Sequence, residues 1–512
     1  MKRRLLSIFL SLTMILSMVP SVWAADEMQQ DDPAAQETET PAKPAMNGNC
    51  GATDADDVTW KLEQNNTGKE NPTYTLTISG SGDMANYTVP VPRSIGGTTV
   101  APNVATRAPW YTALAGFADH ESNTVPITEV VVRDGVTGLG NWAFAYTQVT
   151  KAAFTKSVEN YGIQLYSHCT ELTTVDWTDF APVKVMLHED DTEPYKDAAI
   201  PGNLFDTDRK LHICIVDGTT YTDTLVVPDN VAAVGTSGFY GTAFTEVNFK
   251  TGLKGVRQVG YYSFANMKEL ETLYVPAGLT YVLGATGSNT FAEEAALTSL
   301  TLEEGITEIP ARAFRDNCAI KTLVLPSTIT SIREWAFNNN NSLYAVDLTK
   351  ISNKLTVGNG GVNAYKDGTT VCAFYVADTG VIEALKDPNN GDRFNKYGYF
   401  AFTDGGTFPA DTSFESGKLA TPVKDGYVFA GWYTKDGTNG DWGDKVTSST
   451  KLTAGATYYA KWNTAVLSGD CSAAGNENNV HWELTPNSDG AYTLTISGKG
   501  AMADYSCNIT RD

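Results

Sequence analysis

The chain has 512 residues, a formal net charge of −22 at pH 7 and 42% hydrophobic residues. The length suggests about three domains, and the hydrophobic content is high enough for most of the chain to bury a core. Because so acidic a chain repels phosphate backbones, we expect no nucleic-acid partner.

The N-terminus, residues 1–24, has the pattern of an export signal. Basic residues at positions 2–4 precede an apolar run over Leu5–Pro20, and Val22 and Ala24 occupy the small-residue positions of a cleavage site. The run is shorter than the roughly 20 residues that span a bilayer, and no later stretch reaches that length. We therefore expect an exported protein, at the cell surface, in the cell envelope or secreted, with no transmembrane segment in the mature chain.

Residues 25–46 are rich in Pro, Ala and acidic side chains, which predicts a disordered spacer. The next segment, residues 47–126, contains "VTWKLEQ" and "YTLTISG". Their alternation of apolar and polar residues predicts paired strands with one buried face. Because this segment runs directly into the repeats described next, we interpret it as an N-terminal β cap that keeps the first repeat from aggregating.

Residues 127–350 are predicted to form a repeat array. The strings "ITEVVVRDGVTGLGNWAF", "LTSLTLEEGITEIPARAF" and "IKTLVLPSTITSIREWAF" align without a gap, and further copies are degenerate, partial or carry small insertions. An irregular stretch, "HEDDTEPYKDAAIPGNLFDTD", interrupts the series. The L-x-L core of each copy has strand periodicity, and stacked copies can share a core that no single copy could bury.

A Cys or Asn that follows the Phe at the end of a repeat is expected to point inward. Stacked repeats would then form a ladder of such residues, as in the N/C position of leucine-rich repeats. The residues concerned are Cys169, Cys318 and Asn340. We therefore predict that Cys169 and Cys318 are buried structural residues.

The units resemble BspA-like leucine-rich repeats, the type 5 or treponemal-type class, and the strings "VTGLGNWAF" and "ITSIREWAF" carry this resemblance. It implies a non-enzymatic surface protein that binds host matrix or neighbouring cells. Residues 351–400, with "VCAFYVADTGVIEALKDPNN", resemble the strand and short helix that cap such arrays. The predicted fold class is mainly β, a leucine-rich-repeat solenoid flanked by β-rich modules.

Residues 401–463 are predicted to form a different module. The strings "GYVFAGWY" and "YYAKW" resemble the internalin-B-type B repeat, or Listeria–Bacteroides repeat, which is a small β-grasp-like unit of surface proteins. Within it, Trp432 and Tyr433 are expected in a core strand. Trp442 is the better candidate for exposed stacking on a sugar.

Residues 464–512 repeat the opening of the N-terminal cap. "YTLTISGKGAMADY" matches "YTLTISGSGDMANY", and Cys471 aligns with Cys50. The second copy contains no counterpart of "APWYTAL". We therefore expect Val466–Asp512 to be an incomplete cap module with unburied apolar surface around Met502 and Tyr505.

No sequence motif for catalysis is found, so the prediction is no catalytic residue, no metal ligand and no cofactor. A thiol nucleophile formed by His168 and Cys169 is disfavoured because neighbouring side chains on a turn usually point apart. Calcium binding by the acidic run at residues 188–193 stays open, although the spacing of an EF-hand is missing.

The predicted binding surface follows from the geometry of the stacked repeats. The middle residue of each L-x-L core points away from the interior, and stacking places these residues in one row on a sheet face, which suits an extracellular protein or glycan, such as host matrix or other cells. The alternative is that the row is only a solvated face. The row consists of Val131, Ala153, Asp176, Val226, Asn248, Tyr274, Thr301, Val324 and Asp347.

The leading hypothesis is thus a non-enzymatic exported protein that acts in adhesion or other recognition. Two alternatives are open. The modules could be accessory to a secreted enzyme whose catalytic domain lies beyond residue 512, or they could form a structural spacer of the cell envelope.

Overall fold

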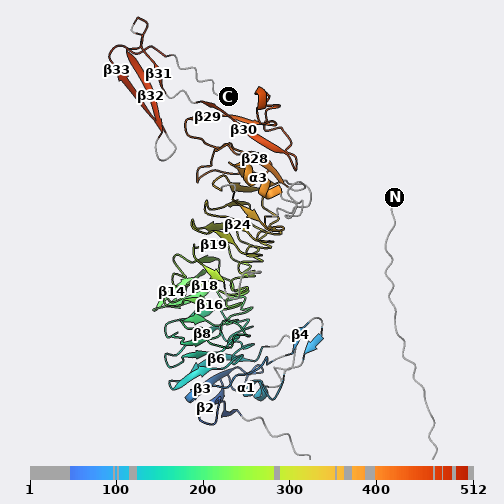
Figure 1. Ribbon diagram of the computed structural model, residues 1–512. Helices are drawn as coiled ribbons and strands as arrows, with labels where there is room; N and C mark the ends of the chain where they lie inside the picture. Colours follow the sequence, from blue (N-terminus) through green and yellow to red (C-terminus); the bar gives the residue numbers. More distant parts are fainter. Residues whose placement is uncertain are drawn as a thin grey trace, which may run out of the picture. The chain divides into compact units, whose positions relative to one another are not determined.

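The computed structural model describes residues 46–90, 92–95, 98–100, 103–114, 124–281, 289–351, 354–362, 372–386, 398–464, 468–475, 477–486 and 492–505. These residues belong to one compact unit, Ala45–Asp512. The predicted export signal at residues 1–24, and the predicted spacer up to residue 45, lie outside them. The fold is mainly β, as predicted, with few helices among many short strands (Figure 1). None of the helices in the described parts of the chain is long and apolar enough to cross a membrane.

Three antiparallel strands open the described chain: β1 (Asn47–Asn49), β2 (Asp57–Gln64) and β3 (Tyr74–Asp83). Alternate side chains of β2 are buried, as its sequence pattern predicts. The short hairpin of β4 (Arg93–Ile95) and β5 (Thr98–Val100) and the helix α1 (Pro109–Ala113) follow.

The array is joined to these strands through β3. The first half of β3 pairs in parallel with β6 (Ile127–Val132), and its second half pairs in parallel with β7 (Val136–Leu139). Both partner strands belong to the first repeat. In α1, Trp110 is fully buried, and its ring centroid lies 6.1 Å from that of Trp60. The opening strands and the first turn therefore share one sheet and one core.

Most turns of the array contribute one strand to a front layer and one to a back layer, which we call the front sheet and the back sheet. Within each layer, neighbouring strands pair in parallel in several shorter hydrogen-bonded groups. The L-x-L cores form the front sheet, which comprises β8 (Lys151–Ala153), β10 (Thr174–Asp176), β13 (Ile213–Val216), β15 (Thr224–Leu225), β17 (Glu246–Asn248), β19 (Thr272–Val275), β21 (Ser299–Leu302), β23 (Thr322–Val324), β25 (Ala345–Leu348) and β27 (Cys372–Val376).

The shorter second strands form the back sheet. It comprises β7, β9 (Asn160–Tyr161), β11 (Lys184–Val185), β12 (Ala199–Ile200), β16 (Ala233–Val234), β18 (Gln258–Val259), β20 (Thr280–Tyr281), β22 (Glu308–Ile309), β24 (Ser331–Ile332) and β26 (Thr356–Val357).

A hairpin interrupts the front sheet. Strand β14 (Thr219–Thr222) folds back antiparallel on β13, and the next front-sheet segment starts only at β15. The sequence pattern did not predict β13. Its "ICIV" is apolar on both faces, so the alternation that reveals the other front strands is missing.

Aromatic side chains at the corner of each turn stack into a continuous aromatic spine. Consecutive ring centroids lie between 5.2 and 6.3 Å apart. This spacing is typical of favourable aromatic pairs. The spine consists of Trp110, Phe144, Tyr166, Phe205, Phe239, Phe264, Phe291, Phe314 and Phe337, and all of them are buried.

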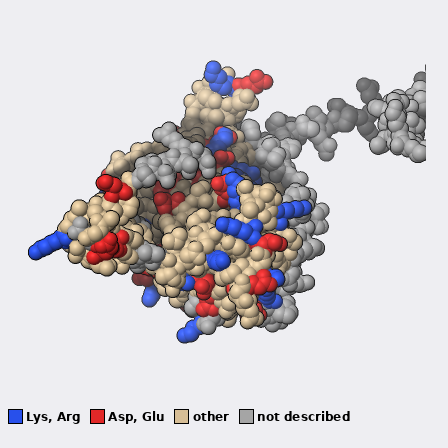
Figure 2. Space-filling model, turned by 90° about the horizontal axis from the view of Figure 1, so that it is seen from above, with Lys and Arg blue, Asp and Glu red and all other residues tan. Residues whose placement is uncertain are grey.

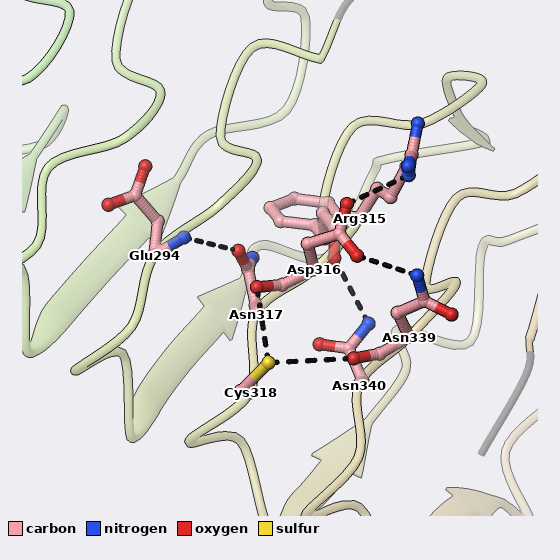
Figure 3. A network of polar contacts seen from close by, with 8 residues as sticks. Glu294, Arg315, Asp316, Asn317, Cys318, Asn339 and Asn340 are labelled. Atoms are coloured by element: carbon pink, nitrogen blue, oxygen red, sulfur yellow. Dashed lines mark hydrogen bonds and ion pairs between the residues drawn. The ribbon is translucent and has the colours of Figure 1, made fainter. Parts of the chain in front are cut away.

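A mostly polar ladder runs beside the spine, three residues after the aromatic residue of each turn, and Figure 3 shows its Asn317 and Asn340. Met267, three residues after Phe264, is an apolar member. The Asn317 amide accepts a hydrogen bond from the Glu294 backbone N–H and donates one to the Phe291 carbonyl, both at 2.9 Å. Asn340 repeats the second contact one turn later, donating to the Phe314 carbonyl at 3.0 Å. These side chains satisfy backbone groups that the turns leave buried.

The prediction for the ladder cysteines is correct for one residue and wrong for the other. Cys169 is fully buried and lies three residues after Tyr166. Cys318 lies four residues after Phe314 and is exposed, because Asn317 takes the inward position (Figure 3). The one-residue offset alone turns the Cys318 side chain outward.

The front sheet continues beyond the array. After β27 and the helix α3 (Thr379–Lys386), it adds β28 (Gly398–Phe402), β30 (Thr457–Thr464) and β29 (Tyr427–Tyr433). Strand β28 spans the point between residues 400 and 401 at which the sequence suggested a boundary. A second apolar cluster covers the outer face of this extension and includes Ala345, Tyr375 and Trp432.

The last described segment is a separate three-stranded sheet of β31 (Ser468–Asp470), β32 (Val480–Pro486) and β33 (Tyr492–Gly498). Its pairing reproduces that of β1–β3: Trp60 lies opposite Ile78, and Trp482 lies opposite Ile496. The duplicated sequence therefore forms the same substructure twice.

Candidate functional site

The outward row on the front sheet is the candidate site, and the strand register brings its members together in groups. Asn248, Tyr274 and Thr301 are direct neighbours on β17, β19 and β21. Ala153 pairs with Asp176, and Val324 with Asp347. Val131 lies in β6, and Val226 directly follows β15.

Asp347 does not face solvent, which contradicts its place in an exposed row. It is only 5% exposed, because the second apolar cluster covers this end of the front sheet. Its carboxylate accepts hydrogen bonds from the backbone N–H and hydroxyl of Thr349 at 2.9 and 2.7 Å. The available row therefore ends at Val324, whose side chain is 48% exposed.

One residue of this face was missed by the sequence analysis. Ile215 of β13 pairs with Asp176 and continues the row. Tyr221 of β14 is 37% exposed, but it pairs with the inward-facing Cys214 and so lies on the other side of the hairpin. The one available signal was the dipeptide "DG" between the strings "ICIV" and "TTYT", because this dipeptide is typical of tight hairpins.

Several polar residues of the row are already engaged within the face. Lys151 forms an ion pair with Asp176 at 2.8 Å, and Thr178 donates to the same carboxylate at 2.7 Å. Partial burial opposes ionisation of Asp176, but the hydrogen bonds from Lys151 and Thr178 outweigh it and lower the pKa. Asp176 is therefore a structural anion rather than a free acceptor for a ligand.

Tyr274 is held in a similar way. Its hydroxyl donates to the Glu303 carboxylate at 2.7 Å, and the backbone N–H of Ala277 donates to the other carboxylate oxygen at 2.9 Å. These bonds fix the tyrosine ring in place on the face. The groups left to contact a partner are thus mainly the ring of Tyr274 and aliphatic side chains.

A groove of about 720 Å³ lies where the β13–β14 hairpin interrupts the front sheet. Apolar side chains of Val216, Tyr221 and Val226 line it, together with Glu246 and an ion pair between Lys254 and Asp229 at 3.6 Å. Of the predicted row, the groove includes Val226. It combines apolar walls with a few polar groups, which is the usual composition of a recognition site.

His168 and Cys169 do not form a nucleophilic pair. The His168 ring stacks on Tyr146 at 4.5 Å, whereas the Cys169 thiol contacts the Phe144 carbonyl at 3.2 Å. Burial raises the pKa of the Cys169 thiol well above its usual value. The thiol therefore stays protonated and has a structural role in the ladder.

The acidic run at residues 188–193 is a capped turn. One Asp191 oxygen accepts the backbone N–H groups of Leu187 and His188 at 2.9 and 2.8 Å. In the part of the chain that the structure describes, no group of three or more His, Cys, Asp or Glu side chains could hold a metal ion.

The tryptophans of the module after the array are packed. Trp432 is buried, as expected for a core strand. Trp442 is only half-buried, and its ring lies 5.7 Å from that of Tyr433 with the Lys461 ammonium 5.2 Å from its centroid. These contacts leave part of the Trp442 ring surface available.

Asp208 occupies the ladder position next to Cys169, and its carboxyl accepts the Cys169 backbone N–H at 2.6 Å. Burial raises the pKa of Asp208 well above its usual value. Since its pKa in the unfolded chain is about 4, this group weakens folding increasingly as the pH rises above about 4.

We expect Asp208→Asn to stabilise the protein by about 1–3 kcal/mol at pH 7.5 and to change little at pH 4. The amide keeps the acceptor for Cys169 and gains a donor for the Tyr166 carbonyl, as Asn317 has for Phe291. Urea unfolding at both pH values measures the difference, with the exposed Asp229→Asn as the control. An equal effect of Asp208→Asn at both pH values would show that ionisation of Asp208 is not involved.

Comparison with known proteins agrees with this architecture. The family described as BspA type Leucine rich repeat region matches residues 122–181 and 217–351, in six copies. A search of curated protein sequences finds no match to the chain.

A search of solved structures matches part of this chain to several bacterial proteins. One from Bacteroides ovatus is 12% identical, with 66% of this chain and 97% of that chain covered at a TM-score of 0.35. A leucine rich cell surface protein from Faecalibacterium prausnitzii is 16% identical, with 61% of this chain and 92% of that chain covered at a TM-score of 0.26. The pneumococcal vaccine antigen PcpA is 15% identical, with 66% of this chain and 96% of that chain covered at a TM-score of 0.30.

Proposed function

We propose that this chain, whose residues 122–181 and 217–351 are BspA-type leucine-rich repeats, is an exported, non-enzymatic protein of the cell surface or envelope that binds an extracellular protein or glycan through its front sheet. The role we favour is adhesion.

The observation that carries the proposal is the front face itself. Ala153 and Val324 are exposed on the front sheet, and the ring of Tyr274 is half-buried there. The charge of Asp176 in the same row is paired with Lys151. Apolar groups within a polar frame are the usual anchors of protein interfaces. Figure 2 shows the end of the molecule seen from above rather than the front sheet, and acidic and basic side chains are interspersed there.

The test is binding of the full chain to immobilised matrix proteins, cells and a glycan array. We expect saturable binding to at least one of them. Absence of saturable binding in every panel would remove adhesion as the leading function.

Two matched valines show whether the front sheet carries this binding. Val324 on the front sheet is 48% exposed, and Val183, which precedes back-sheet strand β11, is 53% exposed. We expect Val324→Asp to weaken binding at least about tenfold, because a charge replaces an apolar contact. Val183→Asp should leave the affinity within about twofold. Equal losses in both variants would contradict a front-sheet site.

A further inference from the structure

A cavity of about 460 Å³ lies on the outer side of the back sheet. Its floor is formed by β7, β9 and β11. One wall is the end of β3 with the residues that follow it, and the other wall is the loop of residues 188–194. This loop belongs to the irregular stretch that interrupts the repeats. We call the cavity the back-sheet pocket, and its lining includes Asn86, Asn141, Lys184, Met186, Glu189 and Pro194.

The floor of the back-sheet pocket is held by its own hydrogen bonds. The strand register places four residues in one row across it, Asp83, Gly138, Asn160 and Lys184. The Asp83 carboxylate accepts hydrogen bonds from the Thr137 hydroxyl at 2.5 Å and the Asn160 amide at 2.9 Å. A Cβ atom at Gly138 would lie 2.7 Å from Asp83 Oδ1, so glycine leaves the room that the carboxylate needs to cross this strand.

Two asparagine side chains at the edge of the floor present amide donors. Asn86 Oδ1 accepts the Asn141 backbone N–H at 3.0 Å, and Asn141 Oδ1 accepts the Ile163 backbone N–H at 2.9 Å. Because a backbone N–H only donates, the oxygen of each amide must face it, and this fixes the orientation of both amide groups. Among the described residues, neither NH₂ group has a hydrogen-bond partner. Both are therefore available to a ligand.

The loop wall is fixed at both ends and carries an acceptor. Asp191 caps the start of the loop through two backbone N–H groups, and at its end the Tyr195 N–H donates to the Val185 carbonyl at 2.8 Å. A wall that is ordered before binding lowers the entropic cost of binding. The Glu189 carboxylate is exposed on this wall and has no partner within the part of the chain that the structure describes.

We infer that the back-sheet pocket binds a neutral mono- or disaccharide, independently of the front sheet. A sugar hydroxyl both donates and accepts, so it can bond the amide donors of Asn86 and Asn141 as well as the Glu189 carboxylate. Met186 and Pro194 add apolar surface for the C–H groups of a sugar ring. The volume lies within the range of about 300–1,000 Å³ that is usual for sites of small ligands.

The charges of the pocket select against acidic sugars. Asp83, Glu189 and Asp191 contribute carboxylates, whereas Lys184 contributes the one ammonium group among the lining residues. This excess of negative charge repels a ligand that carries a carboxylate. A neutral sugar meets no such repulsion.

The experiment is saturation-transfer NMR of the full chain with cellobiose, maltose, lactose and N,N′-diacetylchitobiose. We expect saturable binding of at least one of them. The uronic acid made by oxidising that same disaccharide should bind at least about tenfold more weakly. With the neutral sugar bound, hydrogen exchange should slow at least about threefold in β9 and in residues 186–195, and stay unchanged in β17 and β19.

Variants locate the site. Asn86→Asp and Asn141→Asp keep the acceptor for the backbone N–H but remove the amide donor, so each should weaken sugar binding at least about tenfold. Urea unfolding checks that both variants are folded. The control Asn341→Asp, an exposed asparagine farther along the array, should leave the affinity within about twofold, as should Val324→Asp on the front sheet.

Four results would overturn the inference. They are no saturable binding of any of the four disaccharides, equal binding of the uronic acid, equal losses in the pocket and control variants, and slower exchange on the front sheet instead of around the pocket. Loss of sugar binding in Asn141→Asp with unchanged binding to matrix proteins or cells would show that this site is separate from the one proposed on the front sheet.

Discussion

Replacing Phe291 by Ala is expected to lower the free energy of unfolding by about 3–5 kcal/mol, the range for truncating a buried phenylalanine. Phe291 is completely buried, and its ring stacks on Phe264 at 5.7 Å and on Phe314 at 5.5 Å. The substitution therefore weakens two turn-to-turn interfaces at once. Since each turn of a solenoid contacts only its neighbours, such a defect cannot be compensated elsewhere.

The measurement is urea unfolding followed by circular dichroism, with two controls. Phe291→Leu keeps most of the volume and should cost less than about 1.5 kcal/mol. Thr301→Ala lies on the exposed side of the same region and should stay within about 0.5 kcal/mol. A loss below about 1 kcal/mol for Phe291→Ala would show that the aromatic spine does not hold the turns together.

The second large effect is expected for Asn317→Leu, which should lower the free energy of unfolding by about 2–6 kcal/mol. The substitution removes the bonds to the Glu294 N–H and the Phe291 carbonyl while keeping a similar volume. Two backbone groups are then buried without a partner, and each costs about 1–3 kcal/mol. Unfolding in urea again measures the change, and Cys318→Ala, next to it but exposed, should be nearly neutral.

Asn317→Asp separates hydrogen bonding from shape. The carboxyl can still accept the Glu294 N–H, but it donates to Phe291 only when protonated. Burial would raise its pKa, so this variant should lose stability as the pH rises above about 4. If Asn317→Asp were as stable as the native protein at pH 7.5, the amide donor would not contribute to the ladder.

The regular part of the fold was predictable because one turn cannot bury its own apolar face. The spacing of the L-x-L core and the following Phe predicted the front strands and the aromatic corner, and both are present at Thr322–Val324 and Phe337. The inward ladder was predicted in kind, but Cys318 was misplaced. The spacing itself distinguishes the two cases, since Cys169 lies three residues after Tyr166 and Cys318 lies four residues after Phe314.

Contacts between distant segments set the rest. Asp347 follows the outward pattern, yet it is covered by a cluster that includes Phe408 and Trp432, far along the chain. Strand β13 was missed because both of its faces are apolar. The exposure of Met502 and Tyr505 was predicted correctly from comparison of the two cap copies.

The central claim is that the front sheet is the recognition surface. Hydrogen exchange of the full chain, free and saturated with the protein or glycan that it binds, tests this most directly. We predict slower exchange along β17, β19, β21 and β23, with the back sheet unchanged. Slower exchange confined to β16, β18 and β24 of the back sheet would contradict the claim.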